Sequence, residues 1–519
     1  ALALGGGARR GVAGGADFYA APRLSDDGRR LAWIEWDRPE LPWTATRLCR
    51  AAVAADGSLG AIEVLAGAAG DQSLQQPAFA ADGTLTCLSD RGGWWQPWAE
   101  HDGQWRQVWR DGPAVENAGA VFHPTLRVGR RVDNGAALPT TDSEGWSAPQ
   151  PMAMADHAPA PWQLGTVSHL PLADGGWLLA RLEEGWGRLV ERDGAGRERC
   201  LAAEFSRFRQ LAADAEHFYC IAGAPDRLPA VLAIARSSGC VQVLAGGERP
   251  LPADQLPWPQ SLRFASGEGE SAQAFFYPAQ TTDGEAPPLL VFLHGGPTSA
   301  CYPVFDPRIP FWTRRGFAVA DLNYRGSSGF GRACRLRLAG EWGNIEVQDA
   351  VALVRHLSAL GLADPQRAFI RGASAGGYTA LCALAFHEVF RGGASLYGVS
   401  DPLALRRATH KFEGDYLDWL LGDPERDAAR YRARTPLLHA GRIAAPLIFF
   451  QGGRDAVVVP AQTEAMVAAL RARGLAVEYR LYPEERHGFR RAENLADALQ
   501  REWRFYCALL AAPSPAAGA

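Results

Sequence analysis

Three side chains in the second half of the sequence are of the types, and in the order, that hydrolysis by a serine nucleophile requires. Ser374 is the centre of a G-x-S-x-G pattern, between an apolar strand-like run and a helix-like run. Such an elbow exposes the nucleophile, and small neighbours let the two backbones approach. Asp455 in "GGRDAVVVP" and His487 in "EERHGF" each follow a strand-like run. The order predicts a triad in which His487 takes the serine proton and Asp455 orients the imidazole.

The same chemistry requires two backbone donors for the oxygen anion that forms during acyl transfer. One is the amide of Ala375, which follows the nucleophile at the start of the expected helix. The second we assign to Gly296, in "LHGGP" at the end of the apolar run "PLLVFL". A G-x-S-x-G match by itself is short enough to arise by chance. The strand, elbow and helix around it favour the catalytic interpretation.

The segments that must position these residues alternate between buried strands and amphipathic helices. Runs such as "FAVADLNYRG" and "APLIFFQGG" are typical of parallel strands buried on both faces, and "EVQDAVALVRHLSAL" has helical spacing. This alternation predicts an open, mostly parallel α/β sheet over residues 253–519, with the site at the carboxyl ends of its strands. Four prolines between residues 250 and 259 indicate the crossing from the preceding domain.

Residues 1–252 follow a different pattern, in which alternating strands are joined by tight Asp/Gly turns. Clear copies turn at Asp27-Gly28 and at Asp82-Gly83, and Asp-Gly between alternating strands is a strong hairpin signal. About five units recur roughly 40–55 residues apart, which is the period of a four-stranded propeller blade. We therefore predict an all-β propeller, with a β-sandwich as the alternative. The segment "TLRVGRRVDNGAALPTTDSEGW" fits the repeat poorly.

The composition excludes several classes of partner. The formal net charge is −4 and the basic residues form no stripe, so we expect no nucleic-acid partner. No apolar run is long enough to cross a membrane, and the first residues lack the apolar core of a secretion signal. Nine scattered cysteines without a C-x-x-C pair favour reduced thiols and a cytoplasmic protein. No metal or nucleotide motif is present, so no cofactor is expected, and exposed propeller edges make a homo-oligomer plausible.

Together these motifs resemble the prolyl oligopeptidase family of serine peptidases, especially its acylaminoacyl-peptidase and dipeptidyl-aminopeptidase-like branch. The segments that carry the resemblance are "HGGP" at 294–297, "NYRGSSGFGR" at 323–332, "EWGNIEVQD" at 341–349, "GASAGGY" at 372–378, "GGRDAVVVP" at 452–460 and "HGF" at 487–489.

The resemblance implies a β-propeller over an α/β-hydrolase domain, with Ser374, Asp455 and His487 as the triad and Gly296 and Ala375 at the oxyanion hole. Members of this branch usually carry seven blades. With about five units in this sequence, we expect either a smaller propeller or an incomplete one.

The sequence leaves the substrate open between peptides with a free and with a blocked amino terminus. A free α-amino group needs a carboxylate near the nucleophile, and Glu413 in "THKFEGDYLDW" is our candidate, with a helix-surface acid as the alternative. Tyr324 and Arg325, in "NYRG", are further candidates for substrate contact. The function expected is an exopeptidase of the aminopeptidase or acylaminoacyl-peptidase type. The alternatives are an amidase or esterase acting on a peptide-like small molecule, such as an aminoacylated antibiotic, and an inactive propeller interaction module.

Overall fold

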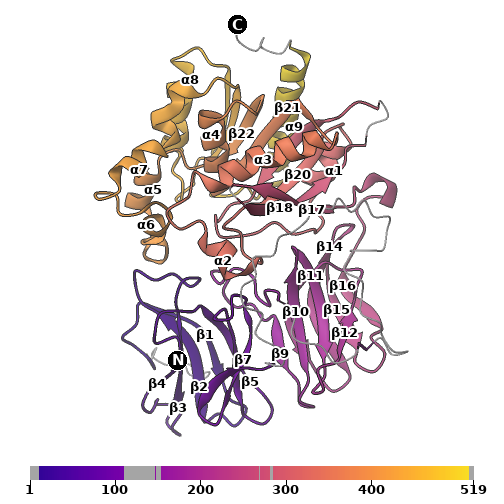
Figure 1. Cartoon of the computed structure of the whole chain (residues 1–519), viewed down its shortest axis with the longest axis vertical. Helices are drawn as coiled ribbons and strands as arrows, with labels where there is room; N and C mark the ends of the chain where they lie inside the picture. The colour runs from indigo at the N-terminus through magenta and orange to yellow at the C-terminus, as the bar shows by residue number, and fades with distance from the viewer. Residues whose placement is uncertain (1–10, 110–145, 148–153, 268, 281–283, 513–519) are drawn as a thin grey trace.

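The computed structural model describes residues 11–109, 146–147, 154–267, 269–280 and 284–512. In this part of the chain, four antiparallel sheets of four strands lie below a larger sheet that is covered by helices on both faces (Figure 1). We call the four sheets the propeller and the segment from β17 onwards the hydrolase unit. The strand order of the four sheets and the parallel core of the larger one confirm the predicted fold class.

The propeller strands follow the chain in order within each sheet. The first and second sheets contain β1 (Phe18–Leu24), β2 (Arg30–Trp36), β3 (Arg47–Ala52), β4 (Glu63–Ala66), β5 (Leu74–Phe79), β6 (Leu85–Ser89), β7 (Gln96–His101) and β8 (Gln104–Gln107). The third and fourth contain β9 (His169–Pro171), β10 (Trp177–Glu183), β11 (Trp186–Arg192), β12 (Glu198–Leu201), β13 (Arg207–Ala213), β14 (His217–Ala224), β15 (Arg227–Ala235) and β16 (Val241–Gly246).

The first hairpin of each of the four propeller sheets is closed by the same kind of aspartate turn. Asp27, Asp82, Asp174 and Asp214 each accept a hydrogen bond from the backbone N–H two residues further on, at 2.8–3.0 Å. In the first three turns a glycine follows the aspartate, with φ between 70° and 83°. An aspartate that bonds its own turn and a residue tolerant of positive φ are what such a tight turn requires.

The first strand of each sheet lies innermost. A cavity of about 640 Å³ is lined by residues of β1, β5, β9 and β13, among them Arg23, Gln76, Leu170 and Ala212. The four sheets are arranged around a common axis, and the first strand of each faces that axis. This is the arrangement of a propeller and not of a β-sandwich. The sequence predicts about five units, whereas the described residues hold four sheets. The poorly fitting segment at 125–146 lies almost entirely outside the described residues, so the count of five stays a prediction.

The hydrolase unit is built on an eight-stranded sheet whose order is β17-β18-β20-β19-β21-β22-β23-β24. Pairing is antiparallel for β17 with β18 and for β18 with β20, and parallel for the rest. The strands are β17 (Gln260–Ser266), β18 (Glu270–Tyr277), β19 (Pro288–Leu293), β20 (Ala318–Asn323), β21 (Asp364–Ala373), β22 (Gly392–Leu396), β23 (Leu447–Gly452) and β24 (Val477–Tyr482).

The helices of the described residues cover both faces of this sheet or extend from its edge (Figure 1). They are α1 (Arg308–Thr313), α2 (Gly331–Leu336), α3 (Ile345–Ala359), α4 (Ala375–Phe386), α5 (Pro402–Ala408), α6 (Tyr416–Leu421), α7 (Ala428–Ala433), α8 (Pro460–Arg471) and α9 (Ala492–Ala511), with short 3₁₀ turns η1 (Ala253–Gln255), η2 (Lys411–Glu413) and η3 (Pro436–Arg442). None of these helices is long and apolar enough to cross a membrane.

Each face of the sheet has its own hydrophobic core because side chains alternate along the strands. On β19, Leu289, Val291 and Leu293 pack into the core under α3, α4 and α8, whereas Leu290 and Phe292 pack into the core under α1 and α9. The sheet is therefore buried on both faces, which explains why its strands read as continuous apolar runs in the sequence.

A buried charge network fastens the propeller to the hydrolase unit. Asp90, which follows β6, accepts hydrogen bonds from the guanidinium groups of Arg332 (2.8 Å) and Arg335, both on α2. Neither the Asp90 nor the Arg335 side chain is exposed to solvent. The Arg335 guanidinium also lies over the ring of Trp95, 3.8 Å from its centroid. Helix α2 is thus held against the second sheet by a fully buried Asp90–Arg335 pair and by the partly exposed Arg332.

Replacing Asp90 with asparagine is expected to lower the free energy of unfolding by about 3–5 kcal/mol, because the buried Arg335 guanidinium would lose the carboxylate that accepts its hydrogen bond. Urea-induced unfolding measures this loss. The matched control is Asp71→Asn in the turn before β5, whose carboxylate is exposed and 3.9 Å from Arg91, and it should change stability by less than about 0.5 kcal/mol. Equal, small effects of both substitutions would contradict a stabilising role for the network.

Candidate active site

Ser374 lies on a sharp turn between strand and helix, as the sequence predicts. Strand β21 ends at Ala373 and α4 begins at Ala375, and Ser374 between them has φ 55° and ψ −122°. This backbone conformation is strained for a residue with a side chain. A Cβ added to Gly372 would lie 2.2 Å from the backbone of Gly376. The elbow therefore depends on glycine at both positions, and it leaves the serine hydroxyl at the carboxyl edge of the sheet.

His487 joins the serine to the predicted acid. Its Nε2 lies 2.9 Å from Ser374 Oγ, and its Nδ1 lies 2.8 Å from Asp455 Oδ2. A carboxylate oxygen accepts, so Nδ1 carries the proton and donates it, which leaves Nε2 to accept the serine O–H. The three residues come from the loops that follow β21, β23 and β24. The fold thus brings Ser374 and His487 together although 113 residues separate them in the sequence.

The Asp455 carboxylate is fixed by its own loop. Its Oδ1 accepts the backbone N–H groups of Val457 (2.9 Å) and Val458 (3.0 Å), and its Oδ2 accepts the Gln451 side chain at 3.3 Å as well as His487. The side chain is fully shielded from solvent. These bonds leave one orientation for the carboxylate, with an oxygen aimed at the imidazole.

The histidine loop is held by Glu485, a residue that the sequence analysis missed. Its buried carboxylate accepts the backbone N–H groups of Arg490 (2.9 Å) and Arg491 (3.0 Å) and the Asn494 side chain at 2.8 Å. Burial acts to raise the pKa of Glu485, and these hydrogen bonds together hold the pKa below its usual value. The Glu485 carbonyl also accepts the Arg454 N–H at 2.8 Å, so this residue joins the acid loop to the histidine loop. A charged residue two positions before His487 is the signal in the sequence that could have identified it.

The two predicted oxyanion donors belong to the start of α4 and to the loop after β19. Ala375 is the first residue of α4, where backbone N–H groups have no partner within the helix. Gly296 is in the loop after β19 and has φ 122°. The adjacent Gly295 is close to the nucleophile, since a Cβ on it would lie 3.6 Å from the Cβ of Ser374. The loop thus runs beside the serine.

Tyr324 and Arg325, which the sequence analysis expected to touch substrate, are both buried. The Tyr324 hydroxyl donates to the carbonyl of Pro297 at 2.9 Å, and its ring stacks on His294 with centroids 4.2 Å apart. Arg325 forms an ion pair with Asp349 at 2.9 Å, inside the hydrolase unit. The polar groups of both side chains thus bond to internal partners, Tyr324 to the loop that carries Gly296 and Arg325 to α3, and their contact with a substrate stays a prediction.

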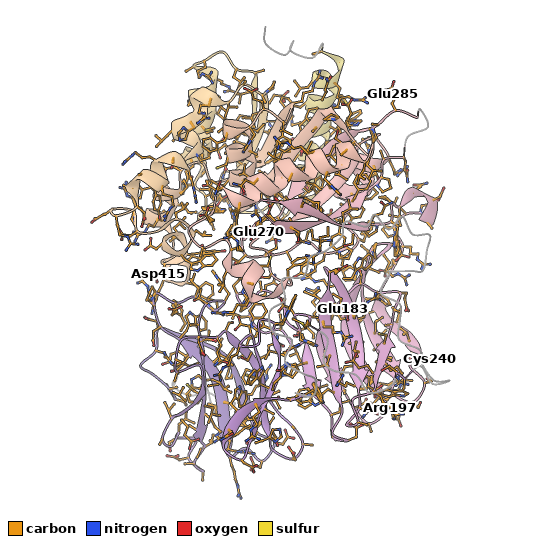
Figure 2. All side chains as sticks on the ribbon, in the orientation of Figure 1. Glu183, Arg197, Cys240, Glu270, Glu285 and Asp415 are labelled. Carbon is orange, nitrogen blue, oxygen red and sulfur yellow. The ribbon has the colours of Figure 1, made fainter. Side chains whose placement is uncertain are left out.

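Glu413 lies at the junction of the two units, on η2. Its neighbours along the chain are paired with the propeller: Lys411 with Asp17 at 2.7 Å, and Asp415, which Figure 2 labels at this junction, with Arg38 at 2.6 Å. The Glu413 side chain is 38% exposed, and its closest cationic partner among the described residues is His410 at 4.0 Å. Its carboxylate is therefore available to a ligand.

Tyr416 bonds to the loop that carries Gly296, and the nearby charge of Glu413 affects its pKa. Burial raises the pKa of Tyr416, and the negative charge of Glu413 raises it further. The Tyr416 hydroxyl is 3.1 Å from the backbone nitrogen of Thr298, two residues beyond Gly296. The role of Glu413 as the carboxylate for a free amino terminus stays a prediction.

The arrangement can perform acyl transfer. It combines a hydroxyl nucleophile, an imidazole positioned as base, a buried carboxylate behind it and backbone donors beside it. Among the described residues, no group of three His, Cys, Asp or Glu side chains is arranged to hold a metal ion.

Comparison with known proteins places this arrangement among peptidases. Residues 303–512 match the prolyl oligopeptidase family. The structure of a puromycin-hydrolyzing peptidase of Mycobacterium tuberculosis is 32% identical, with a TM-score of 0.83, over 97% of this chain and 71% of that one. The dipeptidyl aminopeptidase BIII of Pseudoxanthomonas mexicana is 30% identical over 50% of this chain and 40% of its own length. The acylamino-acid-releasing enzyme of Arabidopsis thaliana is 27% identical over 40% of this chain. The chain spans less than half the length of these two curated relatives.

Replacing Gly372 with alanine is expected to destabilise the elbow by about 1–3 kcal/mol or more, since the new methyl group would overlap the Gly376 backbone. Urea-induced unfolding measures the change in stability, and labelling of Ser374 by a fluorophosphonate reports the geometry of the elbow. Gly441→Ala is the control, because a Cβ there meets nothing within 4 Å. An alanine at 372 that leaves both stability and labelling intact would contradict the close approach.

Proposed function

Because the chain belongs to the prolyl oligopeptidase family of serine peptidases, we propose that it is an exopeptidase that cleaves amide bonds of short peptides or aminoacyl compounds. The hydrogen-bonded series from Ser374 through His487 to Asp455, on a strained elbow, is the observation that carries this proposal. Because all three residues are present and hydrogen-bonded, we do not favour the alternative of an inactive interaction module.

The proposed reaction proceeds in two halves. The Ser374 oxygen attacks the substrate carbonyl while His487 Nε2 takes the serine proton, and the Asp455 carboxylate stabilises the resulting imidazolium. The negative oxygen of the tetrahedral intermediate accepts the N–H groups of Gly296 and Ala375. The imidazolium then protonates the leaving amine, and an ester links the acyl group to Ser374. Water, deprotonated by the same imidazole, hydrolyses that ester and releases the acid.

A free α-amino group on the substrate fits the charges at the domain junction. Lys411 and Asp415 are neutralised by propeller residues, whereas Glu413 accepts a long hydrogen bond from the Thr409 hydroxyl (3.4 Å) and lies 4.0 Å from His410. An ammonium group near the oxyanion loop would gain a charge-assisted bond to this carboxylate. We therefore favour substrates with an unblocked amino terminus over acylated ones.

An aminoacylated small molecule is the second candidate substrate class. Its support is the similarity of the whole chain, at 32% identity, to a peptidase that hydrolyses puromycin. Such a compound presents the same free amine and scissile amide as a short peptide, so one site serves both.

Ser374→Ala is expected to lower kcat for aminoacyl p-nitroanilides by at least about a thousandfold, because the acyl-enzyme can no longer form. Release of p-nitroaniline measures the rate. Ser237→Ala, at an exposed propeller position, should retain the wild-type rate. Turnover by the Ser374 variant at wild-type rates would exclude the mechanism.

Glu413→Gln is expected to raise KM for free aminoacyl anilides about tenfold, since the amide keeps the shape but loses the charge. N-acetylated substrates should be unaffected, and Glu425→Gln, on the exposed surface of the hydrolase unit, should change neither. The opposite result would be a wild-type protein that prefers acetylated substrates and a Glu413 variant with the same KM values as the wild type. In that case the protein is of the acylaminoacyl-peptidase type and Glu413 is a surface acid.

A further inference from the structure

Thr298, which follows "HGGP" in the loop beside the nucleophile, has all of its polar groups bonded to side chains from elsewhere in the chain. The residue is 1% exposed. Its N–H donates to the Tyr416 hydroxyl at 3.1 Å, and its own hydroxyl lies 2.8 Å from the same oxygen. Its carbonyl accepts the Ser328 hydroxyl at 2.9 Å and the indole N–H of Trp162 at 3.3 Å. Three separate segments therefore fix one residue of the loop.

One of these side chains, Trp162, belongs to the propeller. It lies between the second and third sheets and reaches across to a backbone carbonyl 136 residues further along the chain. Its ring is partly buried against the core of the hydrolase unit. The Trp162 indole thus donates a hydrogen bond directly from the propeller to the loop that borders Ser374.

A second propeller residue supports the other side of Thr298. The Tyr416 ring packs edge-on against Trp43, with centroids 4.7 Å apart. Trp43 lies in the loop between β2 and β3 and is almost fully buried. The hydroxyl that holds the Thr298 N–H is therefore backed by a propeller side chain, just as the Thr298 carbonyl is held by one.

Movement of Thr298 would be transmitted to Gly296 because the turn between them is compact. A Cβ added to Gly296 would lie 2.9 Å from the backbone nitrogen of Ser299 and 3.1 Å from that of Thr298. Oxyanion donors act only when they are within about 2.7–3.1 Å of the developing anion, so a shift of a few tenths of an ångström weakens them.

We propose that Trp162 and Trp43 are positioning residues of the propeller that hold the Gly296 N–H in place through Thr298. The inference rests on the proposed function, since it assigns Gly296 to the oxyanion site. It gives the propeller a part in the chemical step: transition-state stabilisation depends on how the propeller is seated on the hydrolase unit. Neither tryptophan touches the reacting atoms.

Trp162→Phe in the full chain tests this proposal, because phenylalanine keeps an aromatic ring and removes the N–H donor. We expect kcat for an aminoacyl p-nitroanilide to fall about tenfold with KM within twofold, since ground-state binding does not use the oxyanion donors. The inhibition constant of a peptide aldehyde, whose adduct places an oxygen anion at the same donors, should rise by a similar factor. The thermal midpoint should change little.

Trp258→Phe is the matched control, since this indole is exposed and stacks on Trp186. It should leave kcat and aldehyde inhibition unchanged. Trp43→Phe is the second variant, and it should lower kcat in the same direction with unchanged KM even if the Trp162 variant fails to fold.

Two results would overturn the inference while leaving the proposed function intact. Wild-type kcat and aldehyde inhibition in both the Trp162 and Trp43 variants would mean that the propeller does not position the loop. A raised KM with unchanged kcat would make Trp162 a substrate contact instead. A wild-type protein that neither turns over the anilide nor reacts with a fluorophosphonate would overturn the proposed function, and the inference with it.

Discussion

The backbones of β21 and α4 meet at Gly372 and Gly376, where a single added methyl group would lie 2.2 Å from another backbone atom. This contact forces the chain through a positive φ at Ser374 and turns the serine hydroxyl out at the carboxyl edge of the sheet. Strain of this kind persists only where the surroundings over-determine it. Here the strand is buried on both faces and α4 is buried almost throughout, so the elbow cannot relax without disrupting the core.

The other loops of the site are fixed by polar bonds as well as by packing of Val458 and Phe489 into the cores. Asp455 is held by two amides of its own turn, and the histidine loop is closed by the Glu485 carboxylate. These bonds join residues that are close in sequence. The two loops are joined by backbone hydrogen bonds from Gly453 to Tyr482 and from Arg454 to Glu485. The acid and the base are therefore positioned within the hydrolase unit, from residues 451 to 494.

The oxyanion loop differs because its supports come from both units. Tyr324 and Ser328 hold it from within the hydrolase unit, and Trp162 holds it from the propeller. The propeller is in turn fastened by the buried pairs of Asp90 with α2. A rigid attachment is what such a role needs, since a loosely docked propeller would not fix a loop to within tenths of an ångström. The proposed positioning of this loop therefore depends on how firmly the propeller is attached.

The sequence by itself predicted the main features that depend on short separations along the chain. The Asp turns of the propeller, the buried strands, the Ser374 elbow and the order of serine, acid and histidine follow from local patterns of residue type, because backbone preference and side-chain alternation act over a few residues. The hydrogen bonds of His487 agree with that order.

Tertiary structure decided which side chains face which neighbour. Tyr324 and Arg325 stand in the loop next to the site, yet both point inward because their polar groups find internal partners. The contact of Trp162 with Thr298 spans 136 residues, and that of Asp90 with Arg335 spans 245. Such pairs form only when two separately patterned units dock, and neither residue's local sequence carries information about the other.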